Sequence, residues 1–176
     1  MDFYGTLFEM IDMRSFSNLW FWIVLGVMWS STSHYVLGVP WDMATRARRS
    51  EAPEQQHEFE TLVRIYTARL ALITRESGLI IAGGSAFALT VLALLGFVYD
   101  NEFSQAVFLL AFPMSINGLL SVQTAHAIIR NDLTGDGLYR KMRSQRVKTQ
   151  VVGLIAIFVT AMWGMLQNLT GGGPLG

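Results

Sequence analysis

Long runs of apolar residues alternate with two polar, basic segments along this chain. The run at 78–99 holds 22 residues and no charged side chain. A helix rises 1.5 Å per residue, so this run is about 33 Å long, enough to cross a hydrocarbon core of about 30 Å. Three further apolar runs lie at 16–37, 103–122 and 151–169, and only residues 100–102 separate the second run from the third. The pattern predicts an all-α integral membrane four-helix bundle whose second and third spans are adjacent and antiparallel.

Two amphipathic patterns accompany these runs. Residues 2–14 place apolar side chains at helical spacing beside acidic ones, which predicts an N-terminal interfacial helix rather than a signal peptide. A second pattern begins at Pro53, a residue suited to the first turn of a helix, and continues towards residue 77. Glu60 and Arg64 have the spacing of an i, i+4 ion pair on this helix. Its apolar stripe comprises Phe59, Leu62, Val63, Tyr66, Leu70 and Ile73. The amphipathic helix therefore needs a cover for that stripe: lipid headgroups, the other polar segment or a partner.

The distribution of basic residues predicts the orientation. Thirteen Lys and Arg balance thirteen Asp and Glu, so the net charge is zero. Six of the basic residues lie in 42–77, six lie in 130–150, and the remaining one is Arg14. Because short basic loops stay on the cytoplasmic side, both segments are expected in the cytoplasm and both termini in the periplasm. Residues 1–176 then form a single multi-pass membrane domain.

Small and polar side chains within the runs mark faces that are expected to contact protein. Residues 82–86, Ala-Gly-Gly-Ser-Ala, form a small-residue patch of the kind that lets two helices approach closely. Asn117 lies near the middle of the third run and is expected to face protein rather than lipid. Pro113, four residues earlier, removes a backbone hydrogen bond and predicts a kink in that helix.

Two histidines are candidate haem ligands. His34 and His126 each lie a few residues inside the cytoplasmic end of a predicted span, so their depths match. Two such imidazoles can hold a b-type haem iron axially. The alternative is that each is an interfacial histidine bonded to nearby polar groups or water.

Three arginines, Arg46, Arg48 and Arg49, are candidates to bind anionic lipid headgroups. Basic residues of the second polar segment can join them: Arg140, Lys141, Arg143, Arg146 and Lys148. Membrane lipids are thus an expected partner, and the charge pattern does not call for nucleic acid.

Several chemistries are disfavoured by what the chain lacks. It has no cysteine, which excludes disulfides and thiolate ligands. Residues 131–137 resemble the start of a calcium-binding loop, but Arg143 stands at position 12, where a bidentate carboxylate is needed. No Asp, Glu, Lys or Arg lies inside a predicted span, and no nucleotide-binding or hydrolase motif occurs. We expect neither an enzyme nor an independent carrier, and we assign no catalytic, cofactor or metal residue.

The stretches FYGTLFEMIDMRSFSNLWFWIVLGVMWSS, HYVLGVPWDMATRARR and LLGFVYD resemble a family of small, poorly characterised inner-membrane proteins from Gram-negative bacteria. Some members carry the label of a component of the SufBCD iron–sulfur assembly complex. The resemblance implies an inner-membrane location and no activity, because this chain has no cysteine and the named complex is soluble. A weaker likeness, HYVLGVPWD, is similar to one loop in the small membrane subunit of TRAP-type transporters.

These features predict a non-catalytic accessory, assembly or scaffold subunit of a bacterial inner-membrane complex, with a protein partner. Two alternatives stay open. One is a redox subunit that holds a b-type haem between His34 and His126. The other is the small membrane subunit of a transporter, for which a larger permease is the expected partner.

Overall fold

The computed structural model describes residues 16, 19–49 and 52–171, and most of them are helical. In chain order the elements are α2 (Leu19–His34), β1 (Tyr35–Val36), β2 (Val39–Pro40), α3 (Trp41–Arg49), α4 (Pro53–Ala93), the π-helix η2 (Leu94–Val98), α5 (Glu102–Arg130) and α6 (Gly135–Gly171). The prediction of a helical protein is confirmed. The expected interfacial helix at 2–14 lies outside the described residues.

Three stretches of the described chain are long and apolar enough to cross a membrane: Pro53–Val98, Glu102–Arg130 and Gly135–Leu169. They contain the apolar runs predicted after residue 77. Helix α2 has 16 residues, so it is about 24 Å long and falls short of the roughly 20 residues of a typical span. A fourth crossing and a four-helix bundle therefore stay predictions.

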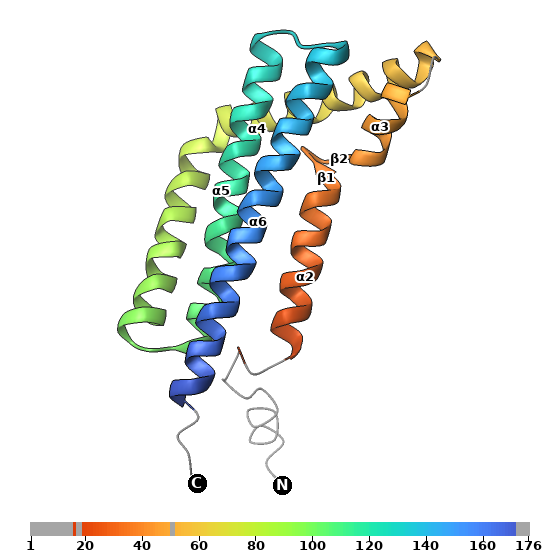
Figure 1. Cartoon of the computed structure of the whole chain (residues 1–176). Coiled ribbons are helices and arrows are strands. Elements are labelled where there is room, and N and C mark those ends of the chain that lie inside the picture. The colour runs from red at the N-terminus through yellow and green to blue at the C-terminus, as the bar shows by residue number, and fades with distance from the viewer. Residues whose placement is uncertain (1–15, 17–18, 50–51, 172–176) are drawn as a thin grey trace, which may run out of the picture.

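The long helices lie side by side (Figure 1). Helix α6 contacts both α2 and α5, and α5 in turn contacts α4. The hairpin β1–β2, α3, the first half of α4 and the α5–α6 connection gather at one end of the molecule, while η2 lies at the other (Figure 1). The two basic segments are thus at the same end.

The sequence predicted a helix over the whole first apolar run, to residue 37. The helix ends earlier. Helix α2 ends at His34, and β1 pairs with β2 in an antiparallel hairpin. Its two turn residues, Leu37 and Gly38, have φ values of 54° and 83°. Positive φ at both central positions is the geometry of a type I′ turn, which fits the twist of two short strands. A Cβ on Gly38 would lie 2.8 Å from the Tyr66 ring, so glycine also permits this close contact.

Both polar segments are more helical than expected. Helix α4 runs without interruption from Pro53 to Ala93 and changes direction along its length (Figure 1). The second polar segment, 130–150, was predicted to be a loop that is partly helical after Gly137, and it is a short connection followed by the first turns of α6. This part of α6 has no proline and is rich in Arg, Lys and Gln, which are good helix formers. The apolar run at 151–169 is therefore the second half of one long helix.

A hydrophobic cluster fills the end where the basic segments meet, and we call this part of the molecule the cap. Its buried members are Val36, Val39, Ala44, Ala47, Phe59, Val63, Ile128, Leu138 and Met142. They come from the hairpin, α3, α4, α5 and α6. Phe59 and Val63 belong to the apolar stripe of α4, so the chain itself covers this part of the stripe.

Candidate functional site

Two charged residues of α4 attach this helix to the α5–α6 connection. Glu60 Oε1 accepts a hydrogen bond from the backbone N–H of Gly135 at 2.8 Å and another from Gln56 at 2.7 Å. Arg64 lies 3.7 Å from Asp132. The predicted ion pair between Glu60 and Arg64 is therefore wrong, because each side chain has a partner elsewhere. The Glu60 carboxylate also stands at the positive end of the α6 dipole, where a negative charge is favourable.

An aromatic pair joins the two basic segments in the cap. The rings of Trp41 and Tyr139 lie 5.5 Å apart. The Arg146 guanidinium lies 4.8 Å from the centre of the Trp41 ring, and Arg48 lies 4.5 Å from that of Tyr139. Such cation–π contacts contribute about 0.5–1 kcal/mol each at exposed sites. Two of the basic residues predicted to face lipid headgroups therefore also hold the cap together.

The three candidate headgroup arginines have different surroundings, although all are exposed. Arg48 packs on Tyr139, as described above. Arg46 forms an ion pair with Asp42 at 3.2 Å. Arg49 makes neither an ion pair nor a ring contact with the described residues. Arg46 and Arg49 line one polar hollow of about 420 Å³, together with Asp42, Thr45 and Gln55. Arg49 thus has the charge that is most available to an anionic headgroup.

We expect the substitution Arg49→Gln to weaken the binding of phosphatidylglycerol about fivefold, because one arginine near an anionic surface contributes about 1 kcal/mol. Native mass spectrometry of the detergent-solubilised protein gives the dissociation constant. Phosphatidylcholine, which has no net charge, is the control lipid and should bind equally to both proteins. Unchanged phosphatidylglycerol affinity would exclude Arg49 as a headgroup ligand.

The two candidate haem ligands lie near the cap. The Nε2 atom of His34 is 3.9 Å from Asp42 Oδ1, and its ring meets that of Tyr35 edge to face at 5.0 Å. His126 is exposed on α5. No contact joins the two imidazoles in the described part of the chain, and no group of three or more His, Asp or Glu there is placed to hold a metal ion. His34 thus has neighbours in Asp42 and Tyr35, and a haem shared with His126 stays a prediction.

Hydrogen bonds between polar side chains connect α5 with α6 where these two helices pack together. Asn117 Oδ1 accepts a hydrogen bond from Thr149 Oγ1 at 2.6 Å, and the Asn117 side chain is buried. Thr124 Oγ1 donates to Gln145 Oε1 at 2.8 Å, and Gln145 Nε2 donates to Ser121 Oγ at 3.3 Å. The prediction that Asn117 faces protein is confirmed. Its partner was missed because Thr149 lies in the second polar segment, which was expected to be only partly helical and was not expected to pack on α5. The i, i+4 spacing of Gln145 and Thr149 was a signal for one helical face.

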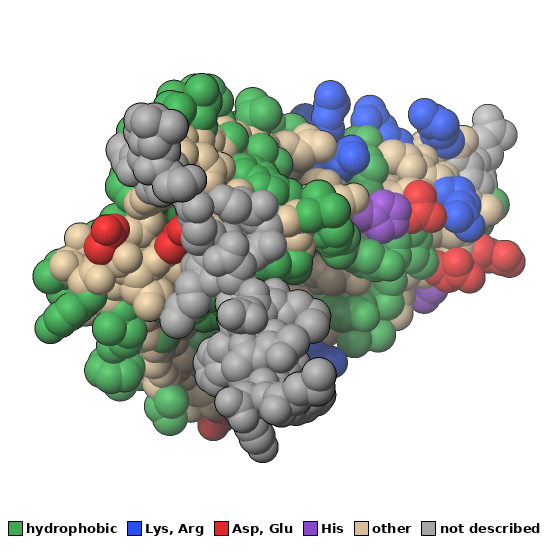
Figure 2. Space-filling view, turned by 90° about the horizontal axis from the view of Figure 1, so that it is seen from below, with side chains coloured by type: hydrophobic (Ala, Val, Ile, Leu, Met, Phe, Trp, Pro, Cys, Tyr) green, Lys and Arg blue, Asp and Glu red, His purple; other side chains and the backbone are tan. Residues whose placement is uncertain are grey.

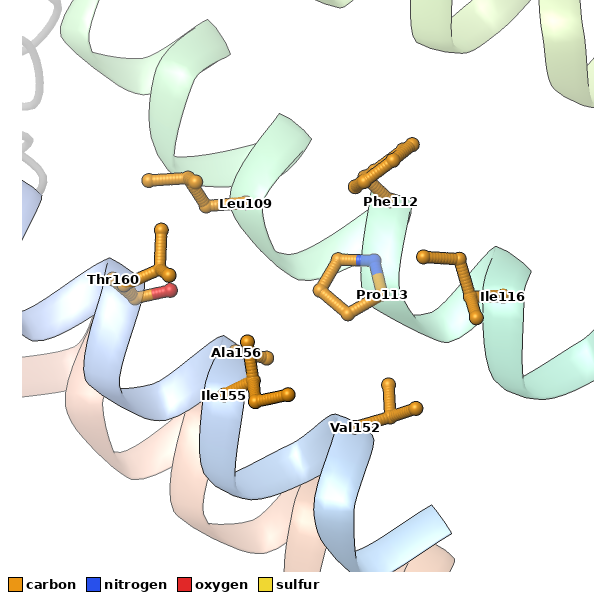
Figure 3. Close-up of a pocket in the computed structure, with 9 residues that line it drawn as sticks. Leu109, Phe112, Pro113, Ile116, Val152, Ile155, Ala156 and Thr160 are labelled. Carbon is orange, nitrogen blue, oxygen red and sulfur yellow. The ribbon is translucent and has the colours of Figure 1, made fainter. Parts of the chain in front are cut away.

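An apolar cavity of about 220 Å³ lies between α5 and α6 (Figure 3). Its lining includes Leu109, Pro113 and Ile116 from α5, and Val152, Ala156 and Thr160 from α6. Thr160 is the polar member of this lining. Its side chain is fully buried, and its Oγ1 has no hydrogen-bond partner among the described residues. A buried hydroxyl in this state costs about 1–3 kcal/mol, so it needs an explanation.

The membrane-length half of α4 contrasts with α5 and α6. None of the most apolar 18-residue stretch of α4 is buried, against 17% of the corresponding stretch in α5 and 28% in α6. The small-residue patch at 82–86 is exposed throughout. A Cβ placed on Gly83 or Gly84 would meet no atom within 4 Å. The patch therefore contacts no other helix of the described chain.

Comparison with known proteins gives no indication of the function, so the function has to be inferred from the contacts and surfaces described above. The chain matches no family model, no curated protein and no solved structure. The exposed patch of α4, the basic cap and the cavity beside Thr160 are the features on which a function can rest.

Proposed function

We propose that this protein is a non-catalytic accessory subunit of a bacterial inner-membrane complex, and that the membrane half of α4 packs against a helix of a larger partner. The observation that carries the proposal is the small-residue patch at 82–86, which faces no helix among the residues that the structure describes. In a membrane, helices associate through close packing of Gly, Ala and Ser. The partner contact we propose is therefore a transmembrane helix that lies against this patch.

In this proposal the rest of the chain holds α4 in a fixed position. The cap buries parts of α3, α4, α5 and α6 in one cluster, and Glu60 binds the start of α6. Figure 2 shows Lys and Arg side chains gathered towards the projecting part of the molecule, with hydrophobic side chains over much of the remaining visible surface. This separation supports an orientation with the cap in the cytoplasm, multi-pass insertion and both termini in the periplasm.

The test is affinity purification from native membranes in a mild detergent, with mass spectrometry of the proteins recovered in stoichiometric amounts. We expect a larger membrane protein to accompany the wild type. The double substitution Gly83→Ile, Gly84→Ile should remove that protein, because two branched side chains prevent close helix approach. Its own fold should be unaffected, since neither position contacts another part of the described chain.

Gly26→Ile is the matched control, because Gly26 lies on an exposed face of α2 and a Cβ there also meets nothing within 4 Å. This variant should keep the partner. Recovery of the wild type without any partner, or as a complex of identical copies, would contradict the proposal. A permease as the partner would identify a transporter subunit, and an electron-transfer complex would identify a redox accessory.

A further inference from the structure

The half of α4 that precedes the membrane-length run has an apolar face that the cap does not cover. Four hydrophobic side chains of this face are exposed: Ile65 (59%), Tyr66 (38%), Leu72 (61%) and Ile73 (40%). Arg69 lies among them, four residues after Ile65 and three before Leu72, at spacings that share one side of a helix. We call these five residues the lower face of α4. Ile65 and Leu72 lie outside the predicted apolar stripe, so the exposed surface is wider than the sequence indicated.

The contacts of α4 define the direction of the lower face. Glu60 and Arg64 bind the α5–α6 connection, at the far end of the cap. Arg69 follows Glu60 by nine residues, or two and a half helical turns, so the two side chains lie on opposite sides of α4. Tyr66, on the lower face, packs on Gly38 in the hairpin turn. In Figure 1 this hairpin lies nearer the apolar parts of α5 and α6 than the α5–α6 connection does. The lower face is therefore turned towards the membrane-length part of the molecule.

The course of α4 places this face at the membrane surface. The helix changes direction along its length, and its second half runs beside α5 (Figure 1). Ile73 precedes Gly78, where the apolar run begins, by five residues, or about 8 Å of helix. An amphipathic helix that lies on a bilayer buries its apolar face about 5–10 Å into the boundary between headgroups and acyl chains. The first half of α4 has the position and the exposed side chains for this arrangement.

The charge on the lower face favours lipid as its cover. Arg69 is exposed and makes neither an ion pair nor a hydrogen bond with the described residues. An arginine can bury its methylene groups on an apolar surface while its guanidinium reaches a more polar layer. The acidic residues on this side of α4, Glu58 and Glu76, lie beyond the two ends of the lower face. A cation surrounded by hydrophobic side chains complements a lipid leaflet, where anionic phosphates lie above acyl chains.

From these observations we infer that the first half of α4 is an interfacial helix. Ile65 and Leu72 insert between the lipids of the leaflet at the cap end, and Arg69 binds a lipid phosphate. The lower face is thus covered by lipid rather than by another protein. This inference goes beyond the accessory role, and it does not depend on a partner at 82–86, because it concerns a different part of α4.

Single labels on cysteine measure the depth of this face, because the chain has no cysteine of its own. Ile65→Cys and Leu72→Cys are each labelled with nitrobenzoxadiazole, and the full chain is placed at one copy per nanodisc of phosphatidylcholine and phosphatidylglycerol. Lipids spin-labelled at two acyl positions locate the fluorophore. Both labels should lie about 5–10 Å below the phosphates and be protected from iodide in the water.

His57→Cys is the matched control, because His57 is exposed on the same half of α4 and lies two helical turns before Arg64, on the opposite side from Arg69. Its label should be quenched by iodide and not by the spin-labelled lipids. Equal iodide quenching at all three positions would overturn the inference. Labels at 65 and 72 that are protected from iodide but not quenched by lipid would also overturn it, since protein would then cover the face.

Arg69→Gln tests the phosphate contact in the Leu72→Cys protein. Quenching by spin-labelled phosphatidylglycerol and phosphatidylcholine gives the relative affinity of this region for the anionic lipid. We expect that relative affinity to fall about fivefold, which is the contribution of one arginine near an anionic surface. Arg64→Gln makes the same replacement on the opposite side of α4 and should leave the relative affinity unchanged. An equal fall in both variants, or no fall in Arg69→Gln, would exclude Arg69 as the phosphate ligand.

Discussion

Replacing Gln105 with leucine is expected to lower the free energy of unfolding by about 2–6 kcal/mol. The Gln105 side chain is 1% exposed and uses both ends of its amide. Its Nε2 donates to the Gly96 carbonyl at 2.8 Å and to Asp100 Oδ1 at 3.1 Å. Its Oε1 accepts from Trp163 Nε1 at 2.9 Å and from Gln167 Nε2 at 2.8 Å. One residue of α5 thereby joins η2 and α6.

The expected loss of stability in Gln105→Leu comes from the polar groups that lose their hydrogen-bond partner. The Gly96 carbonyl lies in η2, where Gly96 is buried, and its hydrogen bond with Gln105 is buried as well. Trp163 Nε1 loses its acceptor in the same substitution. Asp100 and Gln167 lie nearer the end of the molecule, where water can replace the lost bonds. Two unsatisfied groups at about 1–3 kcal/mol each set the expected magnitude.

Gln123→Leu is the matched control, because it makes the same replacement on the same helix. The Gln123 side chain is exposed and makes no hydrogen bond with the described residues. Its substitution should change stability by no more than about 0.5 kcal/mol. Titration with sodium dodecyl sulfate in mixed micelles, followed by tryptophan fluorescence, measures both values. Equal stability of the two variants would show that the Gln105 contacts do not stabilise the fold.

Part of this arrangement followed directly from the sequence. Length and hydrophobicity predict the membrane-length helices after residue 77, because these properties depend on local composition alone. The short turn at 100–102 predicts that α4 and α5 are neighbours, and the contacts between them confirm it. Asn117 was expected to face protein because a polar amide is costly in lipid, and it bonds to Thr149.

The partners of the polar side chains were not predictable in the same way. Glu60 and Arg64 have the spacing of an ion pair, but the fold brings Gly135 and Asp132 within reach of them. Helical periodicity specifies which residues share a face, and it does not say which distant segment covers that face. The hairpin at 35–40 was missed for a related reason. Its apolar residues extend the first run, while their burial in the cap depends on α4 and α6.

Glycines of α6 let this helix approach α2, and the closest approach is at Gly153. Gly153 of α6 faces the Trp29 ring of α2, and a Cβ at this position would lie 2.7 Å from a ring atom. Trp29 is 5% exposed and packs in a cluster with Leu25 and Ala156. Its ring is therefore held on several sides and cannot shift without disturbing neighbouring side chains. This is the geometry in which an added methyl group is costly.

We expect the Gly153→Ala protein to be about 1–3 kcal/mol less stable than the Gly26→Ala protein, because the added methyl group overpacks against Trp29. Gly26→Ala is the matched control on α2, because a Cβ there meets no atom within 4 Å. Both substitutions gain helix propensity of about 1 kcal/mol, so the difference between them isolates the steric contact. Titration with sodium dodecyl sulfate in mixed micelles measures this difference in the free energy of unfolding. A Gly153→Ala protein as stable as Gly26→Ala would mean that α2 can move away from α6 at no cost. Helix α2 would then be a loosely attached element rather than part of the support for α4.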